Sequence, residues 1–282
     1  MTAPLIDAGI VGLTAGPVAS TVDARWLMAY AASLGEIDPR YYDTTAPGGP
    51  VAHPLVPVCY EWPEALALRA KAIEPALAPL SVHGLHHLRV HRPPRAGDSL
   101  RTSATVTAVQ RRPRGTLVVA RYTTVDRGGV PISTTDYGSL YRGVELRGDD
   151  AGPAWEITDD GGDGVRWTDE VAVSAHAAHL YTEGARIYNP IHTDIAVARA
   201  AGLSGLILHG TATLALAVSR VVAHDCSGDP VAVREVAGRF TGMVMMPSTL
   251  TVRGGAIRGA ALAFDALDGG GRRVLSDGVV TR

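Results

Sequence analysis

Lysine is almost missing from this chain of 282 residues, which has a single lysine, Lys71, beside 25 arginines. The formal net charge is −2, so the protein has no general positive field, and nucleic acid is excluded as an expected partner. Cysteine is also scarce. Two residues, Cys59 and Cys226, cannot build a disulfide framework, so the composition favours a reducing compartment and we expect a cytoplasmic protein.

The sequence also lacks targeting and membrane signals. Its first 20 residues contain no positively charged segment, so a signal peptide is not expected. The longest apolar stretch, residues 205–223, is interrupted by His209, Ser219 and Arg220, which favours a buried helix over a membrane span. We therefore expect no membrane partner. The hydrophobic share of 46% with 19% charged residues excludes a disordered chain.

What the sequence does contain is an internal repeat. Residues 148–164 are acidic and glycine-rich, which predicts a linker between an N-terminal unit, 1–147, and a C-terminal unit, 165–282. Residues 30–39 and 181–190 both begin with tyrosine and reach Asp-Pro or Asn-Pro at the same spacing. Residues 49–54 echo residues 205–210 in the same way. A repeat of about 150 residues predicts two copies of one fold.

Each unit predicts a helical segment followed by four antiparallel strands, which is an α+β pattern. Asp23 or Thr21 can cap the first helix, Ser174 the third, and Asp194 a short helix that ends near Gly202. The longer expected helices cover residues 24–34, 56–71, 175–183 and 211–222. The expected strands cover residues 83–91, 101–109, 116–125, 131–141, 235–245, 248–258, 260–267 and 273–280.

The most informative motif is Asn189-Pro190-Ile191-His192, followed 17 residues after the histidine by His209-Gly210. This pattern resembles the signature of MaoC-like acyl dehydratases and (R)-specific enoyl-CoA hydratases. The match runs from Asn189 through Val222, and the first unit resembles the degenerate first repeat of double-hotdog members. The resemblance implies a double hotdog, in which two long helices are each wrapped by an antiparallel sheet and packed as a pseudo-dimer.

The resemblance also implies a function. The ligand would be an acyl thioester of coenzyme A or of an acyl carrier protein, hydrated as a trans-2-enoyl chain or dehydrated as a 3-hydroxyacyl chain, with no cofactor. His192 would be the general acid/base, Asn189 would hold its loop, and the Gly210 N–H would polarise the thioester carbonyl. A histidine and a helix N-terminus suit these roles. The implied substrate-binding residues are Ile187, Tyr188, Pro190, His209 and Thr211, and His209 is alternatively a structural residue.

One position departs from the signature, because its catalytic aspartate is replaced by Ile187. Another carboxylate, Glu183 or Asp194, can substitute, or His192 can act alone. Alternatively, the protein binds a thioester without hydrating it, or it is a thioesterase that uses Glu36 or Glu183. Glu36 aligns with the missing aspartate and Tyr41 with His192, but we expect this first unit to be structural because tyrosine is a poor base at neutral pH.

Four histidines, His83, His86, His87 and His91, cluster before Pro93. Helical spacing would suggest a metal site, but the flanking residues favour a strand, so no metal is expected. On a strand, residues 83, 87 and 91 would share one face, which could line the ligand groove. Because one chain already contains both repeats, the sequence is compatible with a monomer or a homodimer.

Overall fold

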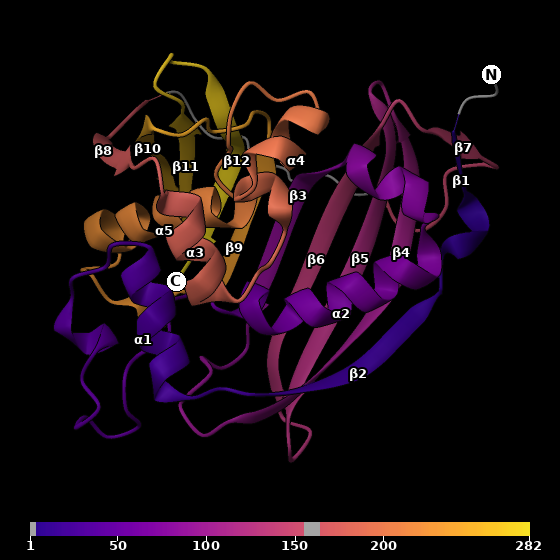
Figure 1. Ribbon diagram of the computed structural model, residues 1–282. Helices are drawn as coiled ribbons and strands as arrows, with labels where there is room; N and C mark the ends of the chain where they lie inside the picture. The colour runs from indigo at the N-terminus through magenta and orange to yellow at the C-terminus, as the bar shows by residue number, and fades with distance from the viewer. Residues whose placement is uncertain (1–3, 155–163) are drawn as a thin grey trace.

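A single antiparallel sheet of ten strands runs through both halves of the protein (Figure 1). The computed structural model describes residues 4–154 and 164–282. The strand order is β2-β4-β5-β6-β3-β9-β12-β11-β10-β8, so five strands from each half lie together and the halves join where β3 pairs with β9. Two copies of one sheet are therefore joined edge to edge, in agreement with the predicted repeat.

The N-terminal part of the sheet contains β2 (Thr14–Thr21), β3 (Ser81–Val90), β4 (Ser99–Arg112), β5 (Gly115–Asp126) and β6 (Pro131–Arg142). The C-terminal part contains β8 (Trp167–Val173), β9 (Glu235–Phe240), β10 (Ser248–Arg258), β11 (Ala261–Leu267) and β12 (Arg273–Thr281). A separate parallel pair is formed by β1 (Leu5–Asp7) and β7 (Glu145–Arg147). The strands expected from residue 101 to 141 and from 248 to 280 are confirmed.

The strands β2 and β8, which lie at the two edges of the large sheet, were not predicted from the sequence. Edge strands are typically short, charged or interrupted by proline, because these features discourage pairing with other chains. The β2 strand contains Pro17, and β8 contains Asp169 and Glu170. These residues interrupt the alternation of apolar and polar residues from which a strand is predicted.

The strand expected over residues 235–245 was wrong at its end. The β9 strand ends at Phe240, because the following backbone pairs with the segment before the long apolar helix. The Leu208 N–H donates to the Val244 carbonyl (2.8 Å), and Met245 forms an isolated bridge with Ile207. The methionines at 243, 245 and 246 therefore lie beyond the strand.

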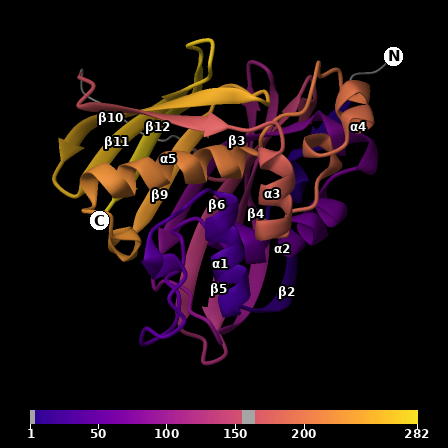
Figure 2. The ribbon, with the colours of Figure 1, turned by 60° about the vertical axis from the view of Figure 1, so that its left-hand side comes forward.

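Two helices of 16 residues, α2 (Pro57–Ala72) and α5 (Gly210–Asp225), pack on the sheet, one in each half. The shorter helices α1 (Ala24–Ser33) and α3 (Ala177–Ala185) pack against each other between the halves (Figure 2). Gly184 permits this contact, because a Cβ atom there would lie 2.7 Å from the Ala29 carbonyl oxygen. The remaining helices are α4 (Ile195–Ala200) and short 3-10 turns at Ala8–Ile10, Pro39–Tyr41, Pro75–Leu80, Pro190–His192 and Pro230–Ala232.

Helix caps decide where several of these elements begin. Asp23 accepts a hydrogen bond from the Trp26 N–H (2.7 Å) and Asp194 accepts one from the Ala196 N–H (2.8 Å), as expected. The expected Ser174 cap was wrong. The α3 helix begins at Ala177 after His176, and the Ser174 backbone carbonyl, not its hydroxyl, accepts the Ala177 N–H.

The predicted linker lies only partly within the described residues. Its first part packs on the sheet, where Ala151 pairs with Val109 and the Pro153 carbonyl accepts a hydrogen bond from Gln110 (2.8 Å). Residues 155–163 of this prediction lie outside the described residues. Within residues 4–154 and 164–282, no helix is both long and apolar enough to cross a membrane.

Candidate active site

The predicted motif forms the loop between α3 and α4. The α3 helix ends at Ala185, and the next residue, Arg186, adopts a left-handed backbone conformation (φ 57°). This region of backbone conformation favours glycine. The arginine keeps the conformation while its guanidinium stacks 4.1 Å above the Trp26 ring, so the helix end is fixed against α1.

His192 closes the short turn Pro190–His192 and is half-buried. Its backbone N–H donates to the Asn189 carbonyl (3.2 Å). Its Nδ1 atom lies 3.0 Å from the Ile207 carbonyl oxygen, which can only accept, so Nδ1 carries the proton and Nε2 presents a lone pair. Burial lowers the pKa of His192 to about 4, against the smaller opposing effect of Ile207. The ring is therefore neutral at pH 7 and able to accept a proton.

His209 lies directly against this ring. The two imidazoles stack with centroids 3.8 Å apart, and His209 is buried at the start of α5. Its Nε2 lies 3.1 Å from the Thr182 hydroxyl. Burial lowers the pKa of His209 to about 2, and the adjacent His192 adds to this effect. A buried, neutral ring held by a hydroxyl supports the structural alternative for His209.

Gly210 is the first residue of α5, where backbone N–H groups are free of helical partners and the helix dipole is positive. A Cβ atom at this position would lie 3.3 Å from the Phe240 ring and 3.4 Å from Nδ1 of His83. A side chain here would therefore crowd both rings, and glycine avoids this. The position combines free N–H groups at a helix N-terminus with the absence of a side chain.

The structure brings His192, His209 and Gly210 together through the His192–His209 stack. The other predicted residues lie around this centre in different settings. Ile187 is buried in the core, whereas Tyr188 and Pro190 are exposed on the loop surface. Asn189 is half-buried before the turn, and the Thr211 hydroxyl accepts a hydrogen bond from Tyr181 (3.0 Å).

No carboxylate of the described residues forms an ion pair or hydrogen bond with His192. Glu183 is exposed on α3, and Asp194 is engaged as the cap of α4. Glu36 instead contacts Ser219, which lies nine residues and therefore ~13 Å along α5 from Gly210. The geometry thus brings neither Glu183 nor Asp194, the two expected substitutes, to His192, and Glu36 also lies elsewhere.

Glu36 belongs to a second buried cluster, at the place in the N-terminal half that mirrors the motif loop. The Leu55 N–H donates to Nδ1 of His53 (3.1 Å), so neutral His53 carries its proton on Nε2, 3.1 Å from the Ser219 hydroxyl. Ser219 then donates to Glu36. Burial lowers the pKa of His53 to about 3, which keeps it neutral.

This cluster cannot perform the chemistry of a serine hydrolase, because His53 donates to the serine and has no lone pair facing it. Pro54 stands where the repeat has Gly210 and supplies no backbone N–H. Tyr41 is buried, and burial raises its pKa above the ordinary value. These observations agree with the expectation that the first half is structural.

The histidine strand β3 was predicted correctly, but the expected face was wrong. A bulge between His83 and Leu85 shifts the alternation by one residue. His83 and His86 therefore share the inner face, where their rings lie 5.4 Å apart, while His87 contacts Glu235 and His91 contacts Thr134 (2.9 Å). Among the described residues, no group of three or more His, Cys, Asp or Glu side chains could hold a metal.

The aromatic surroundings of Gly210 were not predicted from the sequence. The His83 ring stacks on Tyr137 with centroids 3.8 Å apart and lies 4.1 Å from Phe240. These side chains come from β3, β6 and β9, which meet at the join of the halves. Gly84 inside an otherwise regular strand was the available signal, because glycine in a strand often marks a bulge.

Comparisons with known proteins agree with this architecture. Residues 160–258 match the MaoC like domain, and residues 9–135 match the FAS1-like dehydratase domain region. The MaoC-like dehydratase of Phytophthora capsici superimposes with a TM-score of 0.87 at 22% identity, over 96% of this chain and 95% of that one. A protein of Mycobacterium tuberculosis described as having a double hotdog fold superimposes with a TM-score of 0.60 at 19% identity, over 96% of this chain and 95% of that one. The fold is therefore a double hotdog.

Sequence relatives lead to the same class. The chain is 43% identical to the peroxisomal enoyl-CoA hydratase 2 of Arabidopsis thaliana over 63 residues, 22% of this chain and 20% of the relative. It is 27% identical to a probable enoyl-CoA hydratase 2 of Dictyostelium discoideum over 186 residues, 63% of this chain and 62% of the relative. The chain thus spans less than two thirds of either relative. The match of residues 160–258 to the MaoC like domain agrees with the family that the motif resembles.

Proposed function

We propose that this protein hydrates trans-2-enoyl thioesters of coenzyme A or an acyl carrier protein, or catalyses the reverse dehydration of 3-hydroxyacyl thioesters. The observation that carries the proposal is the free Nε2 lone pair of neutral His192 beside the N-terminus of α5. The similarity to proteins named enoyl-CoA hydratase 2 supports the same reaction class.

His192 acts as the single acid/base in this proposal. Its Nε2 takes a proton from water as the water oxygen bonds to C3 of the enoyl chain, and the electrons of the C2–C3 double bond move toward the thioester carbonyl. The Gly210 N–H stabilises the resulting enolate oxygen. The His192 imidazolium then returns its proton to C2. An imidazolium with a lowered pKa is a strong acid, so this last step is favoured, whereas the same lowering makes neutral His192 a weaker base in the first step.

Ile187 determines how fast this chemistry is expected to be. A buried aliphatic side chain cannot take a proton or orient water, and the described residues offer His192 no other carboxylate. Loss of one acid/base group typically lowers a rate by ~10²–10⁴. Slow turnover is therefore the expected outcome.

The direct test is hydration of trans-2-enoyl-CoA esters, followed by loss of the conjugated thioester absorbance. We expect turnover by the wild-type protein, loss of turnover in His192→Ala, and wild-type rates in His176→Ala, an exposed histidine at the start of α3. Equal rates in the wild type and His192→Ala would refute the assigned role.

A second candidate, a non-catalytic acyl-thioester-binding protein, is favoured by Ile187 alone. Calorimetric binding of saturated acyl-CoA together with no hydration at any chain length would establish it in place of the hydratase. Release of free coenzyme A thiol would instead identify a thioesterase.

A further inference from the structure

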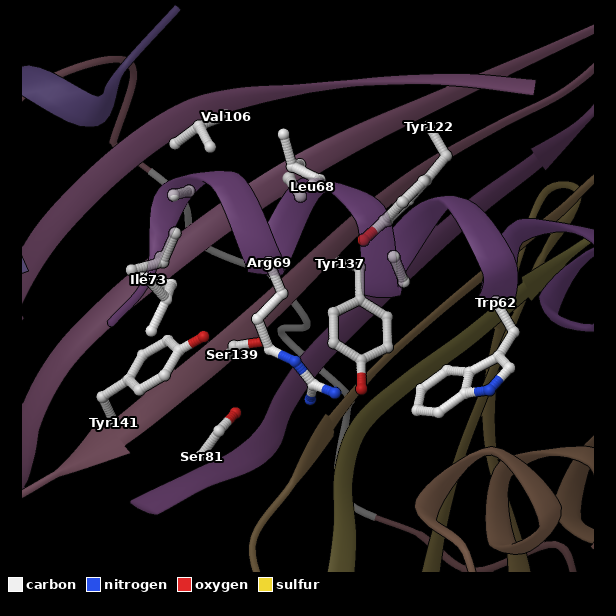
Figure 3. Close-up of a pocket in the computed structure, with 14 residues that line it drawn as sticks. Trp62, Leu68, Arg69, Ile73, Ser81, Val106, Tyr122, Tyr137, Ser139 and Tyr141 are labelled. Carbon is white, nitrogen blue, oxygen red and sulfur yellow. The ribbon is translucent and has the colours of Figure 1, made fainter. Parts of the chain in front are cut away.

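A cavity of about 70 Å³ lies between α2 and the sheet of the N-terminal half (Figure 3). Its apolar wall includes Leu68, Ile73 and Val106. Its polar wall includes the guanidinium of Arg69, which extends from α2 between the rings of Tyr137 and Tyr141. A ligand that fills this space must therefore be apolar along part of its length and polar at one place.

Arg69 has no ion pair or hydrogen bond with any side chain or carbonyl in the described parts of the chain. Its charge lies close enough to Tyr137 and Tyr141 to oppose the effect of burial, which raises the pKa of both phenols. A half-buried arginine without an anion is unusual, because guanidinium groups in such places normally pair with a carboxylate or phosphate. The cavity therefore contains a guanidinium that has no anionic partner among the described residues.

Tyr137 connects this cavity with the candidate active site. One part of its ring lines the cavity, and its face stacks on His83 (3.8 Å). Nδ1 of His83 in turn lies 3.4 Å from the position of a Cβ atom on Gly210. Two stacked rings thus span the space from Gly210 to the cavity. The buried Nε2 of His83 has no hydrogen-bond partner among the described residues, so the layer of rings between Gly210 and the cavity contains an unsatisfied polar atom.

We propose that the cavity receives the far end of the acyl chain and that Arg69 selects chains ending in a carboxylate. The apolar wall would surround the methylene groups, and the guanidinium with the neighbouring tyrosine hydroxyls would bind the terminal carboxylate. This inference rests on the proposed function, since it names the acyl class that the same site takes.

The test is calorimetric binding of saturated thioesters, which cannot be hydrated, so the result does not depend on turnover. Hexanoyl-CoA is compared with adipoyl-CoA, and the butanoyl–succinyl and octanoyl–suberoyl pairs are measured in the same way. We expect the carboxylate-ended member to bind about tenfold more tightly or better at one chain length. The Arg69→Met variant is expected to remove this preference and to leave hexanoyl-CoA binding nearly unchanged.

Arg69→Lys keeps the charge but not the planar fork, so it should retain part of the preference. Arg101→Met is the matched control, because Arg101 is an exposed arginine on β4 away from the cavity lining. Equal binding within every pair, or a preference that persists in Arg69→Met, overturns the inference even if hydration is observed. A preference that depends on Arg69, without any hydration, upholds it while the proposed reaction fails. Absence of binding by every thioester would overturn both.

Discussion

The Nε2 atom of His53 lies 3.1 Å from the hydroxyl of Ser219, and this contact ties the N-terminal half to the middle of α5. The Ser219 hydroxyl donates a hydrogen bond to the Glu36 carboxylate. The side chains of His53, Ser219 and Glu36 thus form one chain of hydrogen bonds between the two halves. Glu36 and His53 stand where the other half has Ile187 and His209, so the two repeats make different contacts at these positions. In the other half His209 stacks on His192, whose Nδ1 contacts the Ile207 carbonyl.

Removing the Ser219 hydroxyl should destabilise the protein without changing the reaction. Ser219→Ala leaves the His53 Nε2–H and the Glu36 carboxylate without their shared partner, which is expected to lower the free energy of unfolding by about 1–3 kcal/mol. Urea unfolding measures this loss. The exposed Ser204→Ala should change stability by less than about 0.5 kcal/mol. A Ser219→Ala protein as stable as the wild type would show that the hydrogen-bond chain contributes nothing.

Restoring a carboxylate at position 187 tests the one-base mechanism. Ile187→Asp and Ile187→Asn both place a polar side chain in the core, so both should lower stability. Only Asp can take a proton, and we expect its kcat/KM for enoyl-CoA hydration to exceed that of Asn by about tenfold or more. Equal rates in the two variants would mean that position 187 does not face the reacting water.

The decrease in kcat/KM at low pH should follow the protonation of the His192 ring. Its folded pKa is about 4, so the catalytically useful neutral ring is present throughout the neutral range and is lost only as the pH falls toward 4. We expect kcat/KM to be flat on its acid side from pH 8 down to about 5.5. An NMR titration of the His192 ring gives the same pKa independently of turnover. A midpoint near 6.5 in both measurements would contradict the buried environment.

Crowding the N-terminus of α5 should reduce catalysis while the fold persists. Gly210→Ala places a Cβ atom 3.3 Å from Phe240, in the space assigned to the thioester carbonyl. Because alanine is a better helix former than glycine, we expect a folded protein with kcat/KM lowered by about tenfold or more. Gly210→Ala with Phe240→Leu should regain part of the rate. Gly205→Ala is the control, since its Cβ would meet only the flexible end of Met245 at 3.5 Å. Unchanged kinetics in Gly210→Ala would remove Gly210 from the proposed site.

Local patterns account for the parts of the fold that the sequence predicted well. Asp23 and Asp194 cap helices that begin one residue later, and the apolar stretch after His209 forms α5. The motif loop was also located correctly. In each case the decisive contacts involve residues close together in the chain, so spacing and residue type are sufficient.

The features that escaped prediction depend on partners far apart in the sequence. Ser219 and Glu36 are 183 residues apart, and no local pattern pairs them. The bulge after His83 inserts one residue and moves His87 and His91 to the outer face, away from Gly210. A single unpaired residue reverses every later assignment of faces, because side chains alternate with a period of two.

The pairing of β3 with β9 also has a consequence for synthesis of the chain. The β3 strand ends at residue 90 and has β6 on one side, but its other edge is covered only when residues 235–240 are made. A nascent N-terminal half therefore presents an open strand edge on the ribosome, the kind of surface that pairs with other chains. The C-terminal half therefore protects the N-terminal half from such pairing only after β9 has been synthesised and has paired with β3.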